Sequence, residues 1–353
     1  MTREGGLPRH CRSDKDSANG LHTRRDLIRL GAAGAASWLA GVPVGGQAPV
    51  EETRMLRRVD TSVLTIGFEE SGRPDGFPVI LLHGFPDDVR AWDAVAAHLA
   101  REGRRVLVPY LRGHGATRYR DPTALRTGEQ AAIGQDLLDL ADALSLRQFA
   151  VAGYDWGGRA ACIAAALHPD RVRAAVIIGG YAIQDTVSLS RPAAPEREQA
   201  LWYQWYFSTE RGRAGLAANR RSLCRLLWKL WSPMWTFQES EFDATAPSFD
   251  NPDFVDVVIH SYRHRHGYAA GEARFLEVER LLARRPRIAA PTVVLYGADD
   301  GVAGPPPPND TFDRRMFENL IDRQIVPRVG HFLPREDPGA VSAALTRVLR
   351  TWA

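Results

Sequence analysis

The chain has 353 residues, of which 44% are hydrophobic and 25% are charged, proportions that are ordinary for a globular protein. It carries 45 basic and 42 acidic residues, but residues 1–48 hold seven of the former and four of the latter, so the remainder is balanced at 38 of each. A balanced chain offers no electrostatic basis for a nucleic-acid partner. The length fits one large α/β domain with an insertion.

The first 48 residues resemble a twin-arginine export signal. Arg24 and Arg25 precede an apolar pair, and residues 30–46 are uncharged and mostly Ala and Gly. Such a stretch is a poor folded helix because of its glycines, and it is short and only mildly apolar for a bilayer core. We therefore expect a leader, cleaved near Ala48, that sends the protein to the periplasm or outside the cell without a membrane anchor. If translation starts downstream of the leader, the protein is cytoplasmic instead.

Beyond residue 49 the sequence alternates short apolar runs with helical patterns. Such alternation predicts an α/β fold, with buried parallel strands joined by crossover helices. The expected strands are Val79–Leu82, Arg105–Val108, Phe149–Ala152, Ala174–Ile178 and Pro291–Tyr296. The expected helices are Ala91–Arg101, Glu129–Leu144 and Gly157–Leu167. We assign residues 49–180 and 286–353 to this core.

Residues 181–285 break the alternation. They contain no convincing strand and are rich in aromatic residues, among them Trp202, Tyr203, Trp205 and Tyr206. We expect an inserted helical cap over the carboxyl ends of the strands, where ligands bind in open α/β sheets.

A glycine-rich turn joins the expected strand Phe149–Ala152 to the helix that follows it. From Gly153 to Gly158 it reads Gly-Tyr-Asp-Trp-Gly-Gly, with Asp155 as the central residue. Glycines two before, two after and three after that residue relieve crowding at a sharp strand-to-helix turn, which is the arrangement of a nucleophile elbow. The alternative is an ordinary N-cap, because aspartate before a helix is common.

The expected strand Val79–Leu82 runs into a His-Gly-Phe-Pro turn. A turn at this place supplies a backbone N–H, here that of Phe85, which faces the elbow. Together with the N–H of Trp156 it would form an oxyanion hole. We expect His83 and Pro86 to contact the substrate, although His83 could also be a core histidine.

An acid and a histidine complete the set. Asp299 and Asp300 follow the expected strand Pro291–Tyr296, and His331 follows the apolar pair Ile325–Val326. The chain order nucleophile, acid, histidine is that of a hydrolase triad. Each residue has an ordinary alternative as a helix cap or a core histidine, but the pieces in this order at strand ends favour a catalytic site.

With these motifs the sequence resembles the α/β-hydrolase superfamily, and within it the epoxide hydrolase and haloalkane/haloacid dehalogenase branch. The resemblance covers about residues 55–353, and the Asp-Trp-Gly-Gly elbow and the His-Gly-Phe-Pro turn are its most specific parts. It implies a mostly parallel sheet with helices on both faces, a helical cap and a small-molecule substrate. It also implies Asp300 as the triad acid, three residues after the strand-end glycine, with Asp299 in reserve.

An aspartate in the elbow selects the chemistry. A serine that attacks an sp³ carbon leaves an ether, which water does not readily cleave, whereas a carboxylate leaves an ester. His331 can hydrolyse that ester by activating water, with Asp300 orienting the imidazole. The oxyanion hole then stabilises the tetrahedral intermediate at the Asp155 carbonyl. The expected substrates are therefore epoxides or compounds with carbon–halogen bonds, and no cofactor is implied.

Two cap segments favour epoxides. An epoxide oxygen leaves as an alkoxide and needs an acidic hydrogen-bond donor. A Tyr-Gln-Trp-Tyr-Phe run and a later Tyr-Arg pair resemble the cap segments that carry the ring-opening tyrosines of epoxide hydrolases, and they imply Tyr203 and Tyr262 in that role. Both could instead be packing residues, and Tyr206 or Tyr268 could replace them.

Dehalogenation is the main alternative. Fluoroacetate dehalogenases place one arginine directly after the nucleophile and another four residues after it, together holding the substrate carboxylate; this chain has Trp156 and Arg159 there. Their halide-binding His-Trp pair would fall near Tyr203 and Gln204, which also differ. Haloalkane dehalogenases share the Asp-Trp elbow but usually have Asn or Trp where this chain has Phe-Pro. A binding module without catalysis is a third possibility, although neither nucleophile nor histidine is missing.

No metal site is expected. His260 and His264 could share a helix face, but no third ligand of matching spacing follows them, and with His266 they fit a surface or cleft-rim role. The three cysteines form no disulfide framework. Cys162 lies among alanines in an expected helix, where a buried small hydrophobic residue is the simpler interpretation.

Overall fold

The structure, a computed structural model, describes residues 54–186 and 192–350. The export leader expected at residues 1–48 lies outside these ranges, so the leader and the export stay predictions. The strands of the described part are β1 Met55–Asp60, β2 Leu64–Gly72, β3 Pro78–Leu82, β4 Arg105–Pro109, β5 Arg118–Tyr119, β6 Phe149–Tyr154, β7 Val172–Ile178, β8 Thr292–Gly297 and β9 Leu320–Val326.

These strands form one sheet in the order β1-β2-β4-β3-β6-β7-β8-β9, with β5 paired to β2. From β4 to β9 all neighbours are parallel, whereas β1, β2 and β4 pair antiparallel at one edge. The predicted mostly parallel sheet is confirmed, and all five expected strands are present. β3 and β6 are neighbours with Leu82 opposite Gly153, so the His-Gly-Phe-Pro turn and the elbow leave the sheet side by side.

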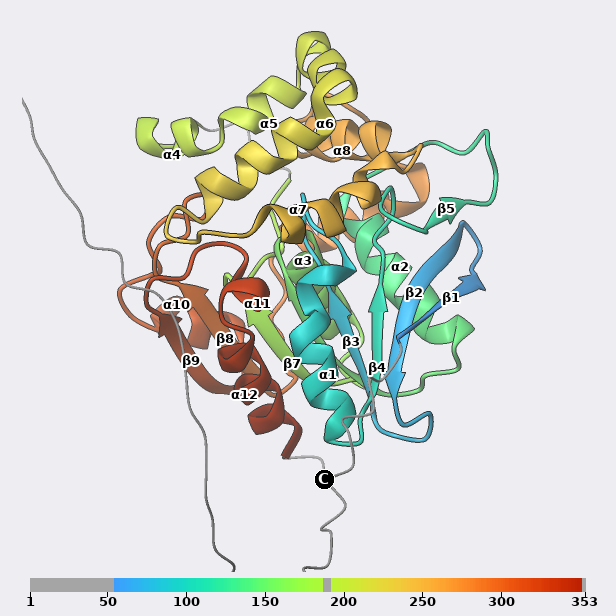
Figure 1. The fold of residues 1–353 in the computed structure, drawn as a ribbon, viewed down its shortest axis with the longest axis vertical. Helices are drawn as coiled ribbons and strands as arrows, with labels where there is room; N and C mark the ends of the chain where they lie inside the picture. Colours follow the sequence, from blue (N-terminus) through green and yellow to red (C-terminus); the bar gives the residue numbers. More distant parts are fainter. Residues whose placement is uncertain (1–53, 187–191, 351–353) are drawn as a thin grey trace, which may run out of the picture. The chain divides into compact units, whose positions relative to one another are not determined.

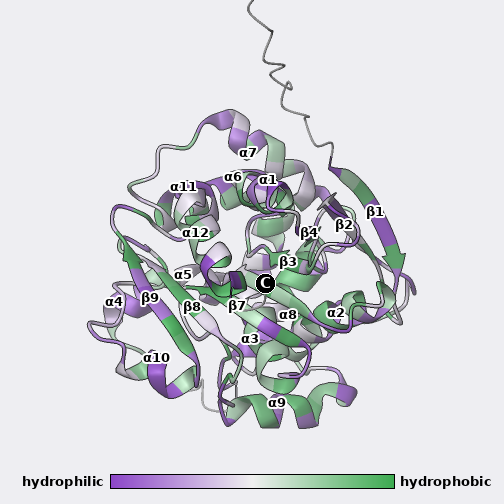
Figure 2. Ribbon diagram, turned by 90° about the horizontal axis from the view of Figure 1, so that it is seen from below, coloured by the Kyte–Doolittle hydropathy of each residue, from purple (hydrophilic) through white to green (hydrophobic). Residues whose placement is uncertain are grey.

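Burial decreases from the centre of the sheet to its edges. β6 and β8 are buried at every residue, whereas β1 is mostly exposed and β9 mostly half-buried. Figure 2 shows the hydrophilic residues of β1 and β9 in purple at the two edges of the sheet. Strands buried on both faces appear in the sequence as continuous apolar runs. The outer strands β1, β2, β5 and β9 lack such runs. The first three were not predicted, and of β9 only the apolar pair Ile325–Val326 was noted.

Helices cover both faces of the sheet, as predicted. α1 Asp93–Arg101 and α12 Pro338–Leu349 pack together in front of it in Figure 1, and α2 Gln130–Ala143 and α3 Asp155–Leu167 pack behind it. The first residues of the helix expected at Ala91–Arg101 belong to a separate 3-10 turn, η1, so α1 begins at Asp93. The helix expected from Gly157 begins two residues earlier, at Asp155. The shorter core helices are η1 Val89–Trp92, α10 Thr311–Met316 and α11 Leu333–Glu336.

The described part of residues 181–285 is helical and contains no strand. Its helices are α4 Pro195–Ala200, α5 Trp202–Phe207, α6 Glu210–Trp231, α7 Glu239–Thr245, η2 Ala246–Asp250, α8 Phe254–Arg265, η3 Ala273–Phe275 and α9 Leu276–Ala283. In Figure 1, α5 to α8 lie above the carboxyl ends of the strands. α9 differs, because it packs against the core helix α2. None of the described helices has the length and apolar character that crossing a membrane requires.

The two cysteines in the described residues, Cys162 and Cys224, are both buried and unpaired. Cys162 is fully buried in α3 among alanines of the core. Its predicted role as a small buried hydrophobic residue is therefore confirmed.

Candidate active site

Asp155 lies at the sharp turn between β6 and α3. Its φ of 49° is in the left-handed region, which is strained for a residue other than glycine. The flanking glycines allow the turn: a Cβ at Gly157 would lie 2.2 Å from the Leu82 carbonyl oxygen, and one at Gly153 would lie 2.4 Å from the Gly157 oxygen. Asp155 is the first residue of α3, and Tyr154 is its N-cap. The predicted elbow is present, and the ordinary N-cap alternative is excluded.

The turn after β3 contacts the Asp155 carboxylate. The backbone N–H of Phe85 donates a hydrogen bond of 2.9 Å to Oδ1 of Asp155. The N–H of Trp156, the second donor that we predicted, belongs to the first turn of α3, whose main-chain N–H groups have no helical acceptor. The Phe85 amide therefore lies beside this carboxylate, and the role of the Trp156 amide stays a prediction.

His331 faces this carboxylate from the loop after β9. Its Nε2 lies 3.9 Å from Oδ2 of Asp155 and has no hydrogen-bond partner among the described residues. Its Nδ1 lies 2.9 Å from Oδ2 of Asp300. The other oxygen of Asp300 accepts hydrogen bonds from the amides of Val302 and Ala303, which fix the orientation of the carboxylate.

The structure distinguishes the two candidate acids. Asp299 is exposed, and its N–H donates to the Val329 carbonyl, so its side chain lies outside the site. Burial opposes charge on both Asp300 and His331, but their mutual attraction outweighs it: the pKa of Asp300 is lowered and the pKa of His331 is raised. Asp300 thus holds the proton on Nδ1 and leaves Nε2 as the basic atom that faces Asp155.

Tyr203 on α5 and Tyr262 on α8 meet where the cap closes on the elbow. Their ring centroids are 5.3 Å apart and the rings are nearly perpendicular. The Tyr262 ring lies 5.7 Å from the ring of Phe85 and 6.0 Å from that of Trp156. The Tyr262 hydroxyl is buried without a hydrogen-bond partner among the described residues, whereas the Tyr203 hydroxyl accepts from Gln204 Nε2 at 3.0 Å.

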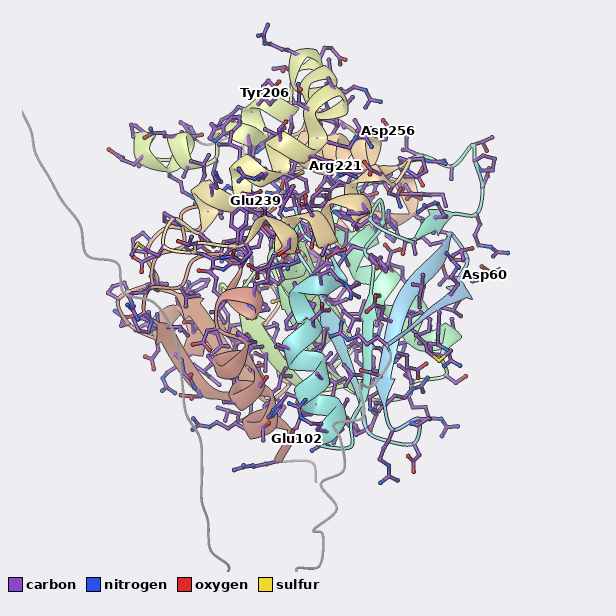
Figure 3. The ribbon with its side chains drawn as sticks, in the orientation of Figure 1. Asp60, Glu102, Tyr206, Arg221, Glu239 and Asp256 are labelled. Atoms are coloured by element: carbon purple, nitrogen blue, oxygen red, sulfur yellow. The ribbon has the colours of Figure 1, made fainter. Side chains whose placement is uncertain are left out.

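Both hydroxyls remain protonated at neutral pH. Burial raises the pKa of Tyr203 to about 12 and holds that of Tyr262 well above its usual value. The tyrosines considered as replacements lie elsewhere. Tyr206, labelled in Figure 3, directs its hydroxyl at Gly215 of α6, where a Cβ would lie 1.8 Å from that oxygen. Tyr268 is 63% exposed.

Comparison with known proteins identifies the family to which this chain belongs. A family model described as "alpha/beta hydrolase fold" matches residues 78–338. The chain belongs to this family. A solved structure described as "a putative epoxide hydrolase from Klebsiella pneumoniae subsp. pneumoniae" is 41% identical to this hydrolase, with a TM-score of 0.80 over 84% of this chain and 97% of the other. Epoxide hydrolase A of Mycobacterium tuberculosis is 26% identical over 327 residues, which are 83% of this chain and 96% of the relative.

The hydrolase is therefore epoxide-hydrolase-like, and the predicted α/β-hydrolase fold is confirmed. Its relatives are not uniform in chemistry. A 2-succinyl-6-hydroxy-2,4-cyclohexadiene-1-carboxylate synthase from Enterobacter sp. is 28% identical over 296 residues, which are 80% of this chain and 96% of the relative. Membership of the family therefore does not determine the reaction of this hydrolase, which depends on the residues of its own site.

Two residues that we expected to contact the substrate of the hydrolase have internal partners. His83 is fully buried; its Nδ1 lies 2.9 Å from the Gly84 oxygen, and its Nε2 accepts from the Leu111 N–H at 3.0 Å. Burial lowers its pKa to about 4, which keeps it neutral. With no ring nitrogen left for a substrate, His83 is a core histidine, which corrects the prediction. The Pro86 carbonyl accepts from Trp228 Nε1 at 2.6 Å and so ties the turn to the cap helix α6.

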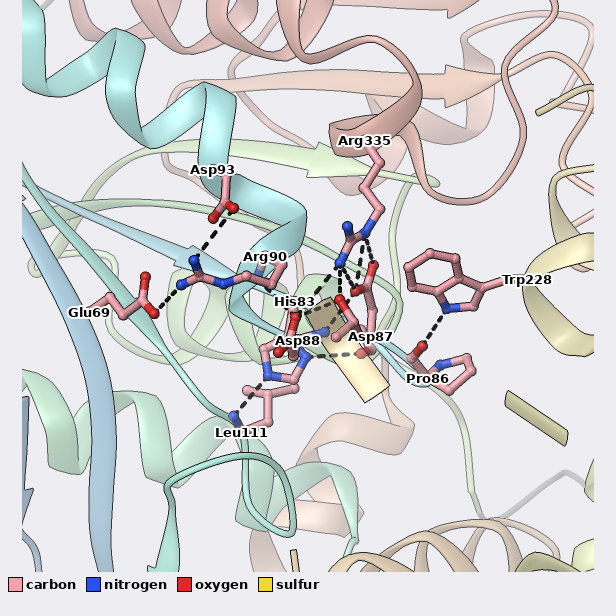
Figure 4. Close-up of polar contacts among 12 residues, drawn as sticks. Glu69, His83, Pro86, Asp87, Asp88, Arg90, Asp93, Leu111, Trp228 and Arg335 are labelled. Carbon is pink, nitrogen blue, oxygen red and sulfur yellow. Dashed lines mark hydrogen bonds and ion pairs between the residues drawn. The ribbon is translucent and has the colours of Figure 1, made fainter. Parts of the chain in front are cut away.

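A buried ion pair that the sequence analysis missed connects the loops of the site (Figure 4). Arg335 on α11 donates to the two oxygens of Asp87 at 2.9 and 2.5 Å. The hydroxyl of Tyr154, the residue before Asp155, donates to Asp87 at 2.5 Å. Arg335 also lies over the indole of Trp228 at 4.6 Å. These contacts therefore join the turn after β3, the elbow, α11 and the cap helix α6.

One group in the described residues has the composition of a metal site. Ligand atoms of Glu129, His264 and Glu279 lie within 4.8 Å of one another. The sequence shows no further metal ligand at a matching spacing from His264. The fold brings two carboxylates to it, those of Glu129 before α2 and Glu279 on α9. Both carboxylates already accept main-chain N–H bonds, Glu129 from Glu272 and Glu279 from Ala131. These bonds join α9 and the segment before it to the start of α2, which is a structural role.

Proposed function

We propose that this hydrolase opens an epoxide to a diol through an alkyl ester on Asp155, which His331 and Asp300 then hydrolyse. The names of two relatives support the substrate class, since the proteins from Klebsiella and Mycobacterium are described as epoxide hydrolases. The arrangement of the described side chains around Asp155 supports the mechanism.

The two oxygens of Asp155 have different surroundings. Oδ1 accepts the Phe85 N–H, and Oδ2 faces His331. We therefore assign Oδ2 as the atom that attacks the epoxide carbon and Oδ1 as the oxygen that becomes the ester carbonyl. In the second step Nε2 of His331 takes a proton from water, and the new oxygen bonds to the ester carbon. Charge then develops on Oδ1, beside the Phe85 amide and the proposed second donor, the Trp156 amide, which lower the barrier. When this intermediate collapses, the bond between the Asp155 carboxyl carbon and Oδ2 breaks, and the diol leaves with Oδ2 and the proton held by Nε2 of His331.

The leaving oxygen needs a proton donor in the first step. As the carbon–oxygen bond of the ring breaks, its electron pair stays on oxygen and a tyrosine hydroxyl supplies a hydrogen bond or the proton. The observation that best supports the proposal is the state of the Tyr262 hydroxyl. This group is buried, protonated and without a hydrogen-bond partner among the described residues. An unsatisfied buried hydroxyl is costly in the free protein, and a bound epoxide oxygen would satisfy it.

A carbon–halogen bond is the second candidate. The indole N–H groups of Trp156 and Trp231 are also buried and lack a partner among the described residues, and a departing halide needs such N–H donors. Trp231 is near the reacting groups, since its ring lies 5.1 Å from that of His331 and 4.9 Å from that of Tyr203.

Trapping the ester distinguishes these reactions. The His331→Gln variant is incubated with styrene oxide and, separately, with fluoroacetate or a chloroalkane. The masses of its peptides are then measured by mass spectrometry. We expect the Asp155 peptide to gain the mass of the intact epoxide with styrene oxide and no adduct with the halides. An adduct with a halide alone would establish a dehalogenase. No adduct in any sample, or an adduct that persists when Asp155→Ala is added, would reject the covalent mechanism.

A further inference from the structure

Two arginines of the hydrolase are buried without a carboxylate partner. Arg159 and Arg265 are only 6% and 7% exposed, and neither forms an ion pair with a described residue. Arg159 Nε donates a long bond of 3.3 Å to the Ala182 carbonyl, and Nη2 of Arg265 has no acceptor among the described residues. Other buried arginines differ: Arg112, for example, donates to both oxygens of Asp136 at 2.6 and 2.7 Å.

These two side chains flank the proposed reacting groups. Arg159 is four residues after Asp155 on α3, so both residues lie on the same side of that helix. Arg265 is three residues after Tyr262 on α8, and its guanidinium lies 4.7 Å from the centre of the Tyr262 ring. One cation thus comes from the core and the other from the cap.

Their burial is unfavourable in the free protein. An unpaired buried charge loses hydration without a compensating partner. Burial, and next the charge of Arg265, lower the pKa of Arg159 to about 10, and the charge of Asp155 only partly offsets this. Two buried cations in this condition, each beside a proposed reacting group, favour binding of an anion there.

We propose that Arg159 and Arg265 form an anion-binding site beside Asp155, and that the substrate is an epoxide that carries a carboxylate. The inference rests on the proposed function, since it names the class of epoxide. A guanidinium binds a carboxylate through parallel N–H···O bonds, and these bonds are stronger when buried. The cations also offset the repulsion between the substrate carboxylate and Asp155, which must meet during attack.

Acids and amides of the same shape test the proposal. The substrates are glycidate, 3,4-epoxybutanoate and 4,5-epoxypentanoate, each compared with its carboxamide. We expect the wild type to prefer the best acid over its amide at least tenfold in kcat/KM. Arg265→Gln should raise KM for that acid about tenfold to a hundredfold more than it raises KM for the amide, because a charged hydrogen-bond pair is lost only with the acid. Equal rates for acid and amide in the wild type would overturn the proposal.

Arg263 provides the matched control. It lies on the same helix, but it already donates to Glu210 at 2.8 Å. Arg263→Gln should therefore keep the preference for the acid. If this variant loses the preference as fully as Arg265→Gln does, general charge on α8 attracts the acid and no specific site exists.

A binding measurement separates this inference from the proposed function. The diol acids and their amides are titrated calorimetrically into the wild type and Arg265→Gln. If no epoxide is turned over, the proposed function fails, but selective binding of an acid that Arg265→Gln abolishes still supports the anion site. Turnover of styrene oxide without selective binding of any acid leaves the function standing and rejects the site.

Thermal melting checks that Arg265 is not a structural residue. Because Arg265→Met removes an unpaired buried charge, we expect its melting temperature to equal or exceed that of the wild type while acid binding is lost. Melting at a lower temperature, together with equal losses for acid and amide, would show a structural role and overturn the proposal.

Discussion

The elbow and the cap tyrosines place their functional groups by different means. Asp155 is positioned by main-chain sterics, since glycines before and after it permit close contacts with the backbone of β3 and α3. Tyr203 and Tyr262 are positioned by side-chain packing, ring against ring, between helices far apart in the sequence. In the proposed mechanism the elbow thus sets the reaction type, and the cap tyrosines set which leaving group receives a hydrogen bond. Variants in the first region should affect every substrate, and variants in the second should affect one step of one reaction.

The largest effect is expected at the elbow. Asp155→Ala removes the nucleophile, and turnover of any substrate should fall at least about a hundredfold, because the covalent route is lost. The fold should remain, since Gly153 and Gly157, which permit the close approach of the neighbouring backbone at this turn, are unchanged. Steady-state rates with styrene oxide and a thermal melt measure both effects. Retention of more than about a hundredth of the activity would show that Asp155 is not the nucleophile.

His331→Gln should separate the two halves of the reaction. The ester still forms, but no base activates water, so the epoxide is consumed in one burst equal to the enzyme concentration and no diol is released. Rapid quenching with styrene oxide measures the burst. Continued turnover at a rate near that of the wild type would point to another base.

Arg335 belongs to both regions, because it bonds Asp87 of the core and stacks on Trp228 of the cap. Arg335→Met should lower the free energy of unfolding by about 3–5 kcal/mol, since Asp87 would stay buried without its counter-charge. The double variant with Asp87→Asn should recover part of that loss. Urea denaturation measures all three proteins. A loss below about 1 kcal/mol would mean that the pair contributes little to holding the loops together.

The cap tyrosines should affect the first step alone. Tyr203→Phe and Tyr262→Phe should each raise the barrier to ester formation by about 2–4 kcal/mol, by analogy with the loss of one oxyanion donor. Hydrolysis of the ester should change little, because its charge develops beside the Phe85 amide. Single-turnover kinetics resolve the steps, and Tyr206→Phe is the control. If neither variant slows opening of the epoxide, the tyrosines are packing residues.

The smallest expected effect is a shift in pH dependence. His331 must be neutral to act as a base, and its raised pKa means that activity is lost as pH falls through a value above the ordinary 6.5 or so. Asp300→Asn removes the attraction that raises this pKa, so the acidic limb should move to lower pH. Asp299→Asn should leave it in place. The pH profile of ester hydrolysis measures the shift, and equal profiles for the two variants would contradict the assignment.

The sequence by itself determined the features that depend on neighbouring residues. Continuous apolar runs predicted the central strands because those strands are buried on both faces. Glycine spacing predicted the elbow because its sterics involve residues within a few positions of Asp155. Local patterns also placed Phe85 and the pair Asp299–Asp300 after their strands and His331 after an apolar pair, and the family resemblance implied Asp300 as the acid. The structure brings Phe85, Asp300 and His331 together at one edge of the sheet.

Only the tertiary structure decided the features that depend on distant partners. Arg335 and Asp87 are 248 positions apart, and no local pattern pairs them. The sequence showed a histidine at position 83 but not that its ring would be enclosed by two main-chain contacts. Likewise, nothing in the sequence distinguished Arg265 from the other arginines, whereas in the fold it is buried beside Tyr262 with no counter-charge among the described residues. Burial and pairing are properties of the packed chain, and they decide whether a charged side chain is structural or available to a ligand.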